Sequence, residues 1–423
     1  MAESSEQTAG QSGPETEGSP QWRLTLATMV AVQLIMSISF TFLAPVLPLF
    51  LPDLGVASAS AVDLWAGVLA SMTSFVAVFT SPFWGRMADR YGRKLMVLRS
   101  SFAIAVCTLL MGLSQSVWHL LALRALMGAF AGFTSASVVL VASQVPERRL
   151  GYALGLLSTG QLVGSLVGPM VGGVVADVTG SYRIPFFVAG TVSLVAFALC
   201  WWLVPERFTK PTEKRRNVST LASMRAMTRT PGLAALVLVL LLTQFAVQAI
   251  QPIVTLYVQE LVGPLPNLAT LGGFAFSVTG LAGVLAVPVL GRRSDTIGYR
   301  RVLLISLAGA ALLTAPQAFV GSYWGFVAQR FGVGLFVGGI LPAANALIGR
   351  LAPASDRGLT YGMTSSAYFL GNSLGPLTGG AVGATVGLRW VFLVTATLLF
   401  ANLVWVYLTV PERFGVGRDE EAA

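Results

Sequence analysis

Long apolar runs alternate with short polar gaps along most of this chain. Each run is about 20 residues long, which is the length an α-helix needs to cross the hydrocarbon core of a bilayer. Twelve such runs follow one another, at 24–43, 64–84, 95–113, 118–141, 151–176, 184–204, 233–257, 269–290, 302–320, 323–348, 359–384 and 388–410. The pattern predicts an all-α membrane protein with twelve transmembrane helices.

The twelve runs form two groups of six that repeat each other. The segment GRMADRYGRK begins at Gly85, and the related segment GRRSDTIGYR begins 206 positions later at Gly291. The letters PERF end both groups, at 205–208 and 411–414. Two pairs share the same 206-residue spacing: Asp89 with Asp295, and Arg124 with Arg330. Parallel six-helix repeats are a known transporter architecture, so we expect two pseudo-symmetric six-helix bundles.

Domain boundaries follow from the two groups. Residues 1–21 are rich in Glu, Ser and Gly and predict a disordered tail without the cationic start of a signal peptide. We expect bundles at 22–204 and 233–411, separated by a basic cytoplasmic linker at 205–232 and followed by a tail at 412–423.

Composition and charge support a membrane protein. The chain is 55% hydrophobic and only 11% charged, whereas soluble domains carry about 25% charged residues. The net charge of +9 could suggest nucleic acid, but the cations lie in the gaps between apolar runs. With the N-terminus inside, 23 of the 27 Lys and Arg residues lie inside and only Arg183 and Arg389 outside. This distribution predicts that both termini are cytoplasmic, and no nucleic-acid partner is expected.

The sequence lacks the residue patterns that several classes of function require. Cys107 and Cys200 both fall within apolar runs, and His119 stands at the edge of one. A lone histidine there is more often a helix-end residue than a ligand. No metal-ligand cluster, nucleophile–base pair or phosphate-binding loop is visible. We therefore expect no enzyme, no metal and no cofactor.

Two glycine-marked segments carry charge between the bundles' second and third helices. Gly85 and Gly92 are expected to permit a helix end and a tight turn around Asp89. Cations surround this single acid, among them Arg90 and Arg93. They can act as a plain topology anchor on the anionic side of the membrane. A charge cluster that forms in one conformation and breaks in another can also bias a two-state equilibrium. The second copy, at Gly291 and Asp295, has Tyr299 where the first has Arg93, and a weaker role is expected.

Arg124 stands inside the fourth run, with Gly128 and Gly132 at four-residue steps on one expected helix face. A charge within a membrane helix costs about 2.5–3.5 kcal/mol on insertion scales and is a functional candidate by default. The alternative is that Arg124 snorkels to the interface, since it lies six residues from Trp118.

The fifth run carries glycines at four-residue steps and a proline, and the eleventh repeats the pattern. Small residues on one face allow two helix backbones to approach closely, and a proline favours a bend. Generic close packing explains the glycines but not the same pattern twice. The residues are Gly155, Gly164, Gly168, Pro169, Gly172 and Gly173 in the first half, and Gly371, Gly375 and Pro376 in the second.

These features together resemble the major facilitator superfamily, over residues 22–414. Three segments are similar to its twelve-helix drug:proton antiporter branch and to bacterial multidrug efflux proteins: PVLPLFLPDLG, SPFWGRMADRYGRKLMVLRS and ALGLLSTGQLVGSLVGPMVGGVVAD. The resemblance implies an inner-gate role for Gly85, Asp89, Arg90, Gly92, Arg93, Gly291 and Asp295. It also implies that Arg124 takes part in proton transfer and that the helix-five glycines form an antiporter motif.

Polar residues within the apolar runs are candidates for the substrate cavity. Each alone is more often interhelical glue than a ligand contact, but together they describe an uncharged, weakly polar cavity suited to bulky amphipathic compounds. They are Gln33, Gln161, Gln244, Gln248, Gln251, Asn345, Tyr368 and Asn372.

No Asp or Glu stands in the middle of an expected helix. Asp53 and Asp63, near the first outer loop, are with Arg124 the remaining candidates for proton coupling. We expect a secondary active exporter of small amphipathic compounds in the bacterial inner membrane, working by proton antiport. The alternative is a dedicated exporter of one metabolite, such as a siderophore or lipid-like compound. Its expected partners are a small-molecule substrate, protons and membrane lipid, and it is expected to be a monomer.

Overall fold

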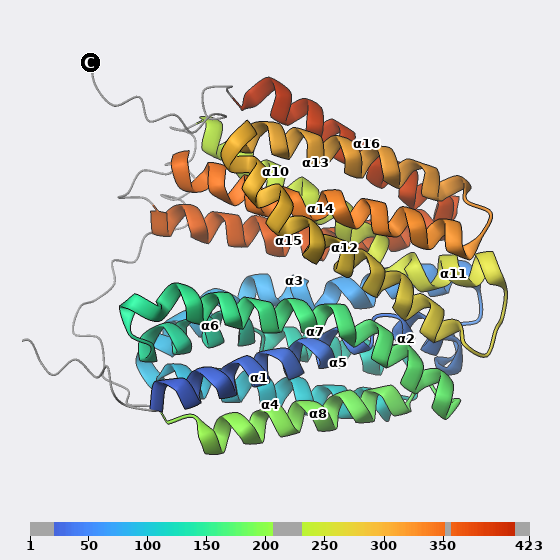
Figure 1. Cartoon of the computed structure of the whole chain (residues 1–423). Helices are drawn as coiled ribbons and strands as arrows, with labels where there is room; N and C mark the ends of the chain where they lie inside the picture. The colour runs from blue at the N-terminus through green and yellow to red at the C-terminus, as the bar shows by residue number, and fades with distance from the viewer. Residues whose placement is uncertain (1–20, 206–230, 352–356, 411–423) are drawn as a thin grey trace, which may run out of the picture.

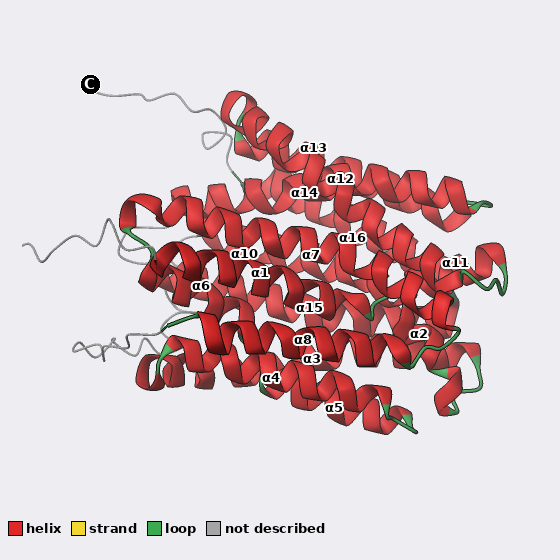
Figure 2. Cartoon of the chain, turned by 60° about the horizontal axis from the view of Figure 1, so that its bottom comes forward, coloured by secondary structure: helices red, strands yellow, loops and turns green. Residues whose placement is uncertain are grey.

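The computed structural model describes residues 21–205, 231–351 and 357–410, and every regular element in these ranges is a helix (Figure 2). Most of the expected linker, residues 1–20 of the expected N-terminal tail and the whole expected C-terminal tail lie outside the described residues. The helices form two groups, one from each half of the chain (Figure 1). The expected all-α architecture of two bundles is therefore what the described chain adopts.

The first bundle contains the helices of residues 21–203. Its members are α1 (Gln21–Phe42), α2 (Val46–Phe50), η1 (Pro52–Leu54), α3 (Ala59–Tyr91), α4 (Arg93–Gly112), α5 (Val117–Ala129), α6 (Phe133–Gln144), η2 (Glu147–Arg149), α7 (Leu150–Thr179) and α8 (Ile184–Leu203). A buried core that includes Met29, Leu140 and Leu157 joins α1, α6 and α7.

The second bundle repeats this order. Its members are α10 (Pro231–Ile250), η3 (Gln251–Ile253), α11 (Val254–Val262), α12 (Leu268–Ile297), α13 (Tyr299–Thr314), η4 (Ala315–Phe319), α14 (Tyr323–Leu351), α15 (Arg357–Val386) and α16 (Leu388–Thr409). Leu240, Leu303 and Leu399 belong to its own buried core.

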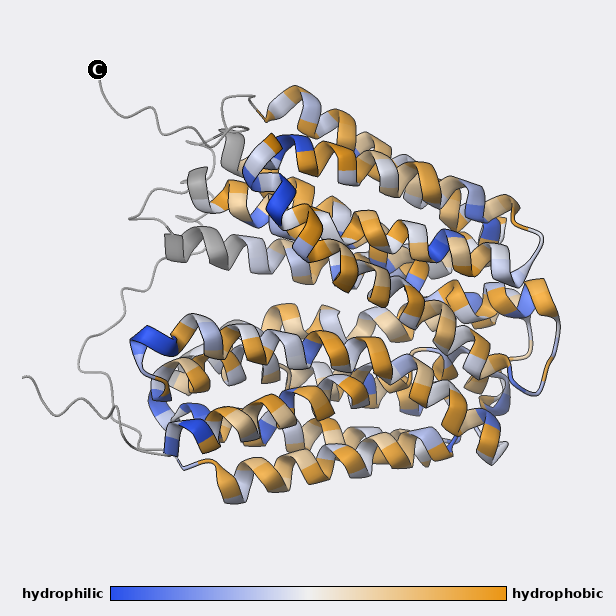
Figure 3. Cartoon of the chain, in the orientation of Figure 1, coloured by the Kyte–Doolittle hydropathy of each residue, from blue (hydrophilic) through white to orange (hydrophobic). Residues whose placement is uncertain are grey.

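Eleven helices in the described ranges are long and apolar enough to cross a membrane. The helix of the eleventh expected run, α15, is 30 residues long but is not among these eleven. Its sequence is rich in Gly, Ser and Thr. Hydrophobic residues dominate the helix surfaces in Figure 3, while hydrophilic residues gather mostly near helix ends. The chain is a multi-pass membrane protein.

Three expected features of the helices were wrong in detail. The segment from Gly85 to Tyr91 is not a loop but the last two turns of α3, and only Gly92 stands at the turn, with φ 100°. The fourth run is interrupted: α5 ends at Ala129 and α6 begins at Phe133, with Gly132 at φ 113°. Gly132 therefore does not continue the helix face of Arg124. The seventh run also changes form, because Gln251 lies in the 3-10 segment η3 rather than on the same α-helix as Gln244.

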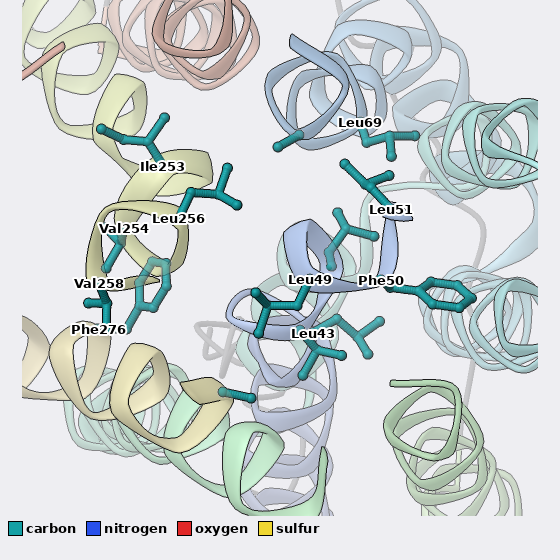
Figure 4. Packing of buried hydrophobic residues seen from close by; sticks show 14 of the residues in the cluster. Leu43, Leu49, Phe50, Leu51, Leu69, Ile253, Val254, Leu256, Val258 and Phe276 are labelled. Carbon is teal, nitrogen blue, oxygen red and sulfur yellow. The ribbon is translucent and has the colours of Figure 1, made fainter. Parts of the chain in front are cut away.

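The two bundles meet at one end of the molecule. We call it the acidic end, because it carries Asp53, Asp63, Asp177 and Glu260; the basic end is the opposite one, with the turns at Gly92 and Gly298. One buried cluster at the acidic end takes side chains from both bundles. Figure 4 shows Leu49 and Leu51 of the first bundle in this cluster with Ile253 and Leu256 of the second. From here the bundles diverge toward the basic end (Figure 1).

Candidate functional site

The first contact between the bundles is a glycine crossing of α7 and α12. Gly173 of α7 lies against the backbone carbonyl of Ala269, and Gly273 of α12 lies against the carbonyl of Pro169. A Cβ atom at either glycine would collide with the opposite backbone. Glycine is needed at both positions because the helices touch main chain to main chain.

The second contact, between α3 and α15, is a copy of the first. A Cβ atom at Gly67 would lie 2.5 Å from the carbonyl oxygen of Pro376 and 2.8 Å from the Cα atom of Gly380. Gly67 is 206 positions before Gly273, and Pro376 and Gly380 lie 207 positions after Pro169 and Gly173. The repeat detected in the sequence therefore generates a pair of equivalent glycine interfaces, one on each side of the molecule.

An acid lies beside each interface, and the first bundle supplies both. Asp177, in the last turn of α7, accepts hydrogen bonds from the backbone N–H groups of Ala269 (3.2 Å) and Thr270 (2.6 Å) in α12. Tyr182 lies close to this carboxylate and to that of Asp53. Burial raises the pKa of Tyr182, and the charges of Asp177 and Asp53 raise it further.

The other acid, Asp63, is 8% exposed and lies in the first turns of α3. A Cβ atom at Gly383 of α15 would stand 3.5 Å from the Cβ of Asp63. Its charged neighbour is Glu260 of α11, which is itself paired with Arg389 at 3.2 Å. Glu260 lies in the last turn of α11. Asp53, the second acid named from sequence, is exposed.

The remaining motif glycines pack within each bundle. Added Cβ atoms at Gly164 and Gly168 would meet the backbone of α1, at the carbonyls of Leu34 (2.6 Å) and Ile38 (2.7 Å), and Gly172 faces the carbonyl of Phe42. In the second bundle, Gly371, Gly375 and Gly379 face α10 in the same way. Gly155 differs, because nothing lies within 4 Å of its added Cβ. One helix of each bundle thus uses adjacent glycine faces for its own bundle and for the opposite one.

Comparisons with known proteins decide the family. The model of the Major Facilitator Superfamily matches residues 29–272 and 264–422. The chain belongs to the major facilitator superfamily. It is 37% identical to the multidrug resistance protein MdtG of Citrobacter koseri, over 93% of this chain and 96% of that protein. It is 36% identical to MdtG of Salmonella arizonae with the same coverage. These relatives confirm the resemblance to bacterial multidrug efflux proteins, and the chain is a multi-pass protein of the bacterial inner membrane.

Solved structures of other transporters share the fold. A bacterial homologue of the human lysosomal transporter Spinster, inward-facing and occupied, aligns with a TM-score of 0.75 and 16% identity, covering 93% of this chain and 97% of that one. The nucleoside transporter NupG aligns with a TM-score of 0.72 and 13% identity, covering 90% and 98%. At these identities the likeness concerns the fold alone.

The basic end carries the superfamily's paired acidic–basic segments. Arg90 is exposed with its guanidinium 5.3 Å from the ring centre of Tyr91, and Arg93 is partly buried. The side chain of Asp89 lies outside the described part of the structure. In the second copy, Asp295 accepts a hydrogen bond from the Tyr299 hydroxyl at 2.7 Å. The tyrosine in place of Arg93 therefore binds the acid of its own copy, across the turn at Gly298.

Arg124 and Arg330 lie inside their bundles. The backbone carbonyl of Arg124 accepts a hydrogen bond from the Thr73 hydroxyl at 3.2 Å. The Arg124 Nε is buried, and no described residue binds it. Arg330 is 5% exposed, and its Nε also has no partner among the described residues. Gly128, one turn after Arg124, faces the backbone of Thr73 in α3. Arg124 is partly buried and Arg330 is buried, so the two equivalent arginines differ in exposure.

Two of the eight predicted cavity residues are brought into contact. The amide of Gln244 donates to the Asn372 Oδ1 at 3.2 Å, which joins α10 to α15. Gln33 is 1% exposed and lies in the first bundle's interior. The other five differ in exposure: Gln161, Asn345 and Tyr368 are exposed, and Gln248 and Gln251 are partly buried. A separate hollow of about 440 Å³ lies along the basic end of α12, and none of the eight is among its lining residues Pro288, Val289, Arg292, Arg293 and Thr296.

Sequence reasoning missed the part that Arg99 plays. It was counted only as a cytoplasmic charge, yet its Nη2 donates to the carbonyls of Phe130 (3.3 Å) and Ala131 (2.9 Å) at the break between α5 and α6. The guanidinium lies 3.3 Å from the ring centre of Trp84, whose Nε1 donates to Ala129. The sequence feature that could have indicated this role is the position of a cation one turn inside an apolar run. The role of Asp177 was also missed.

Proposed function

We propose that this protein is a secondary active exporter of small amphipathic compounds, driven by proton antiport and working by alternating access. The pair of equivalent glycine interfaces at the acidic end carries the proposal. Two bundles that touch at one end and diverge at the other present one face of an alternating-access cycle. The reverse face requires these interfaces to open and the basic ends to close.

In this proposal the chain crosses the membrane twelve times, with α15 as the twelfth span. The many Gly, Ser and Thr residues of α15 are compatible with a membrane span, because α15 packs against α3 and α10 rather than only against lipid. The distribution of Lys and Arg supports a cytoplasmic position for the basic end and for both termini. The acidic end then faces the periplasm, and one chain supplies the whole path, as a monomer would.

We assign proton coupling to Asp63. Arg124 assists in this role, and Asp53 lies at the periplasmic mouth of the path. A charged carboxylate enclosed at the α3–α15 interface is costly unless it is neutralised or paired. Its charged neighbour is another acid, Glu260. Protonation from the periplasm would remove the charge and allow the interface to close. Release of the proton would favour opening, which couples proton entry to drug exit.

At the cytoplasmic side, we propose that the segments at Gly85–Arg93 and Gly291–Asp295 form the inner gate. Arg90 and Asp295 are exposed here, where the bundles are apart. When the basic ends approach, these charges come within reach of the opposite bundle. The Gln244–Asn372 pair and the other cavity amides would bind neutral groups of the compound as it passes.

The test is drug-dependent proton movement in everted membrane vesicles with a fluorescent pH-gradient probe. Neutral, anionic and cationic amphipathic compounds are added in turn to vesicles that hold the wild-type chain, Asp63→Asn or Asp89→Asn. We expect several compounds to dissipate the gradient in wild-type vesicles, and a response reduced at least about tenfold in Asp63→Asn because a carboxyl that cannot ionise cannot carry the proton.

A matched control replaces the exposed Glu147, which begins η2 at the basic end, with Gln and should leave the response unchanged. Response to one compound alone would favour the dedicated exporter. Compound accumulation without proton movement in any condition would contradict antiport.

A further inference from the structure

The N-terminus of α12 is capped by a residue of the other bundle. Its own N-cap residue, Asn267, makes no side-chain cap. The second and third residues of α12, Ala269 and Thr270, instead donate their N–H groups to the two oxygens of the Asp177 carboxylate. These are the N–H groups that a cap residue normally binds, so Asp177 supplies from α7 what the chain next to α12 does not.

The bond has a favourable charge arrangement. Asp177 forms no ion pair with any described residue, and its carboxylate faces the positive end of the α12 dipole. Charge-assisted hydrogen bonds to backbone N–H groups are stronger than neutral ones. The contact is therefore an electrostatic attachment between the bundles. The other contacts of α7 with α12 include a neutral hydrogen bond from the Ser277 hydroxyl to the Leu166 carbonyl at 2.6 Å and the packing of glycine on backbone.

The attachment exists only while the acidic end is closed. Gly173, one turn before Asp177, lies on the carbonyl of Ala269, so the two helices are in van der Waals contact at this level. Any separation of α7 from α12 takes the carboxylate out of hydrogen-bond range of Thr270, since an interaction beyond about 3.5 Å is no longer a hydrogen bond.

The equivalent position in the other interface has no such bond. Ala384 stands 207 residues after Asp177 and has no carboxylate. The N-terminus of α3, which corresponds to α12, is capped by its own Ser58, whose hydroxyl accepts from the N–H of Ala61 at 3.2 Å. The capping across bundles is thus a property of one interface and not of the fold repeat.

We propose that Asp177 is a positioning residue of the transport cycle: its carboxylate latches α7 to the N-terminus of α12 and sets the ratio of closed to open forms at the acidic end. It does not touch the transported compound. Its removal favours the form in which the acidic end is open, and thereby changes the turnover of the transporter without removing its binding site.

The test measures the two forms directly, in purified full-length protein without compound or proton gradient. Cys107 and Cys200, both buried, are first replaced by Ser. Spin labels at Thr179→Cys and Leu265→Cys, both exposed, report the distance across the acidic end; labels at Tyr152→Cys and Arg293→Cys report the basic end. We expect Asp177→Ala to raise the ratio of long to short distances at the acidic end about fivefold, the usual effect of losing a cap. The basic-end pair should move in the opposite sense.

Two further variants make the result specific. Thr270→Ala keeps the backbone donor and should match the wild-type ratio, while Asp177→Asn keeps an acceptor without the charge and should fall between wild type and Asp177→Ala. Wild-type distances in both Asp177 variants would overturn the latch. A shift equally large in Thr270→Ala would also overturn it, since the cause would then be packing. Because no proton gradient and no compound are present, failure of the antiport proposal would leave this measurement unaffected.

Discussion

At the scale of single residues, Arg99 shows how this membrane protein stabilises an interrupted helix. The break between α5 and α6 leaves carbonyl groups of residues 129–131 without their normal helical donors. Arg99 and Trp84 supply three hydrogen bonds to these carbonyls, and the guanidinium stacks on the indole ring. The positively charged group also opposes the negative end of the α5 dipole.

Loss of this arrangement should destabilise the first bundle. For Arg99→Ala we expect a decrease of about 2 kcal/mol in the free energy of unfolding, since hydrogen bonds from a charged donor are lost. Thermal unfolding in detergent should therefore occur at a lower Tm. Arg301→Ala, at an exposed arginine, serves as the control and should change little. An equal Tm for Arg99→Ala and wild type would show that the break is stable without its arginine.

Lys94 and Arg300 stand at equivalent positions of the two halves and make equivalent contacts. Lys94 Nζ donates to the carbonyl of Trp201, and 206 residues later Arg300 Nη2 donates to the carbonyl of Tyr407, both at 2.9 Å. In each bundle a cation at the start of the third helix thus binds the C-terminal turn of the last helix, where the dipole is negative.

At the scale of elements, the helices α7 and α15 each carry glycines on two neighbouring faces. One face of each packs on the first helix of its own bundle, and the neighbouring face packs across the molecule. The two functions can be separated by substitution, because the added methyl group meets a different helix at each position.

Substitutions along α7 should therefore differ sharply. Gly172→Ala places a methyl group against the backbone of Phe42 in α1, and overpacking of this kind typically costs about 1–3 kcal/mol. Gly155→Ala meets nothing within 4 Å and should be neutral or stabilising by up to about 1 kcal/mol, because alanine favours helix. Thermal unfolding and export rate should both decrease for Gly172→Ala only. A comparable loss in Gly155→Ala would show that sequence pattern rather than contact determines the role.

Much of this architecture was predictable from sequence, for reasons visible at the same scale. The apolar runs, the repeat and the glycine periodicity report local geometry, which hydrophobic patterning encodes well. The end of α3 was not predictable, because Arg, Met, Ala and Asp continue a helix after the apolar stretch stops at Trp84. The break at Gly132 also left no trace, since the residues around it are as apolar as the helices. The bond of Asp177 to α12 joins positions about 92 apart through backbone donors, and a side-chain pattern carries no signal of that kind.

At the scale of the whole molecule, the closed acidic end should be lockable. A Cβ atom at Gly383 would stand 3.5 Å from that of Asp63, within the separation of about 3.5–4.5 Å found in disulfides. Asp63→Cys with Gly383→Cys, in a background without Cys107 and Cys200, should form a disulfide on oxidation. We expect oxidation to stop substrate exchange across proteoliposomes and reductant to restore it.

Exchange is the suitable measurement because it needs no net proton movement and so tolerates the loss of Asp63. Each single cysteine variant, oxidised in the same way, should exchange as its reduced form does. Full exchange in the cross-linked double variant would mean that the α3–α15 interface does not open during transport.

The recurrence of the same glycine crossing in both interfaces has a consequence for the ancestry of the chain. If both halves descend from one duplicated gene, the ancestral dimer carried the same glycine crossing on both sides. Asp63 stands where the second half has Ala269, and Asp177 stands where it has Ala384. After fusion, each copy could diverge without changing the other. The proposed division of labour between a protonatable side and a latched side is therefore available only to a single-chain descendant, never to its symmetric homodimeric ancestor.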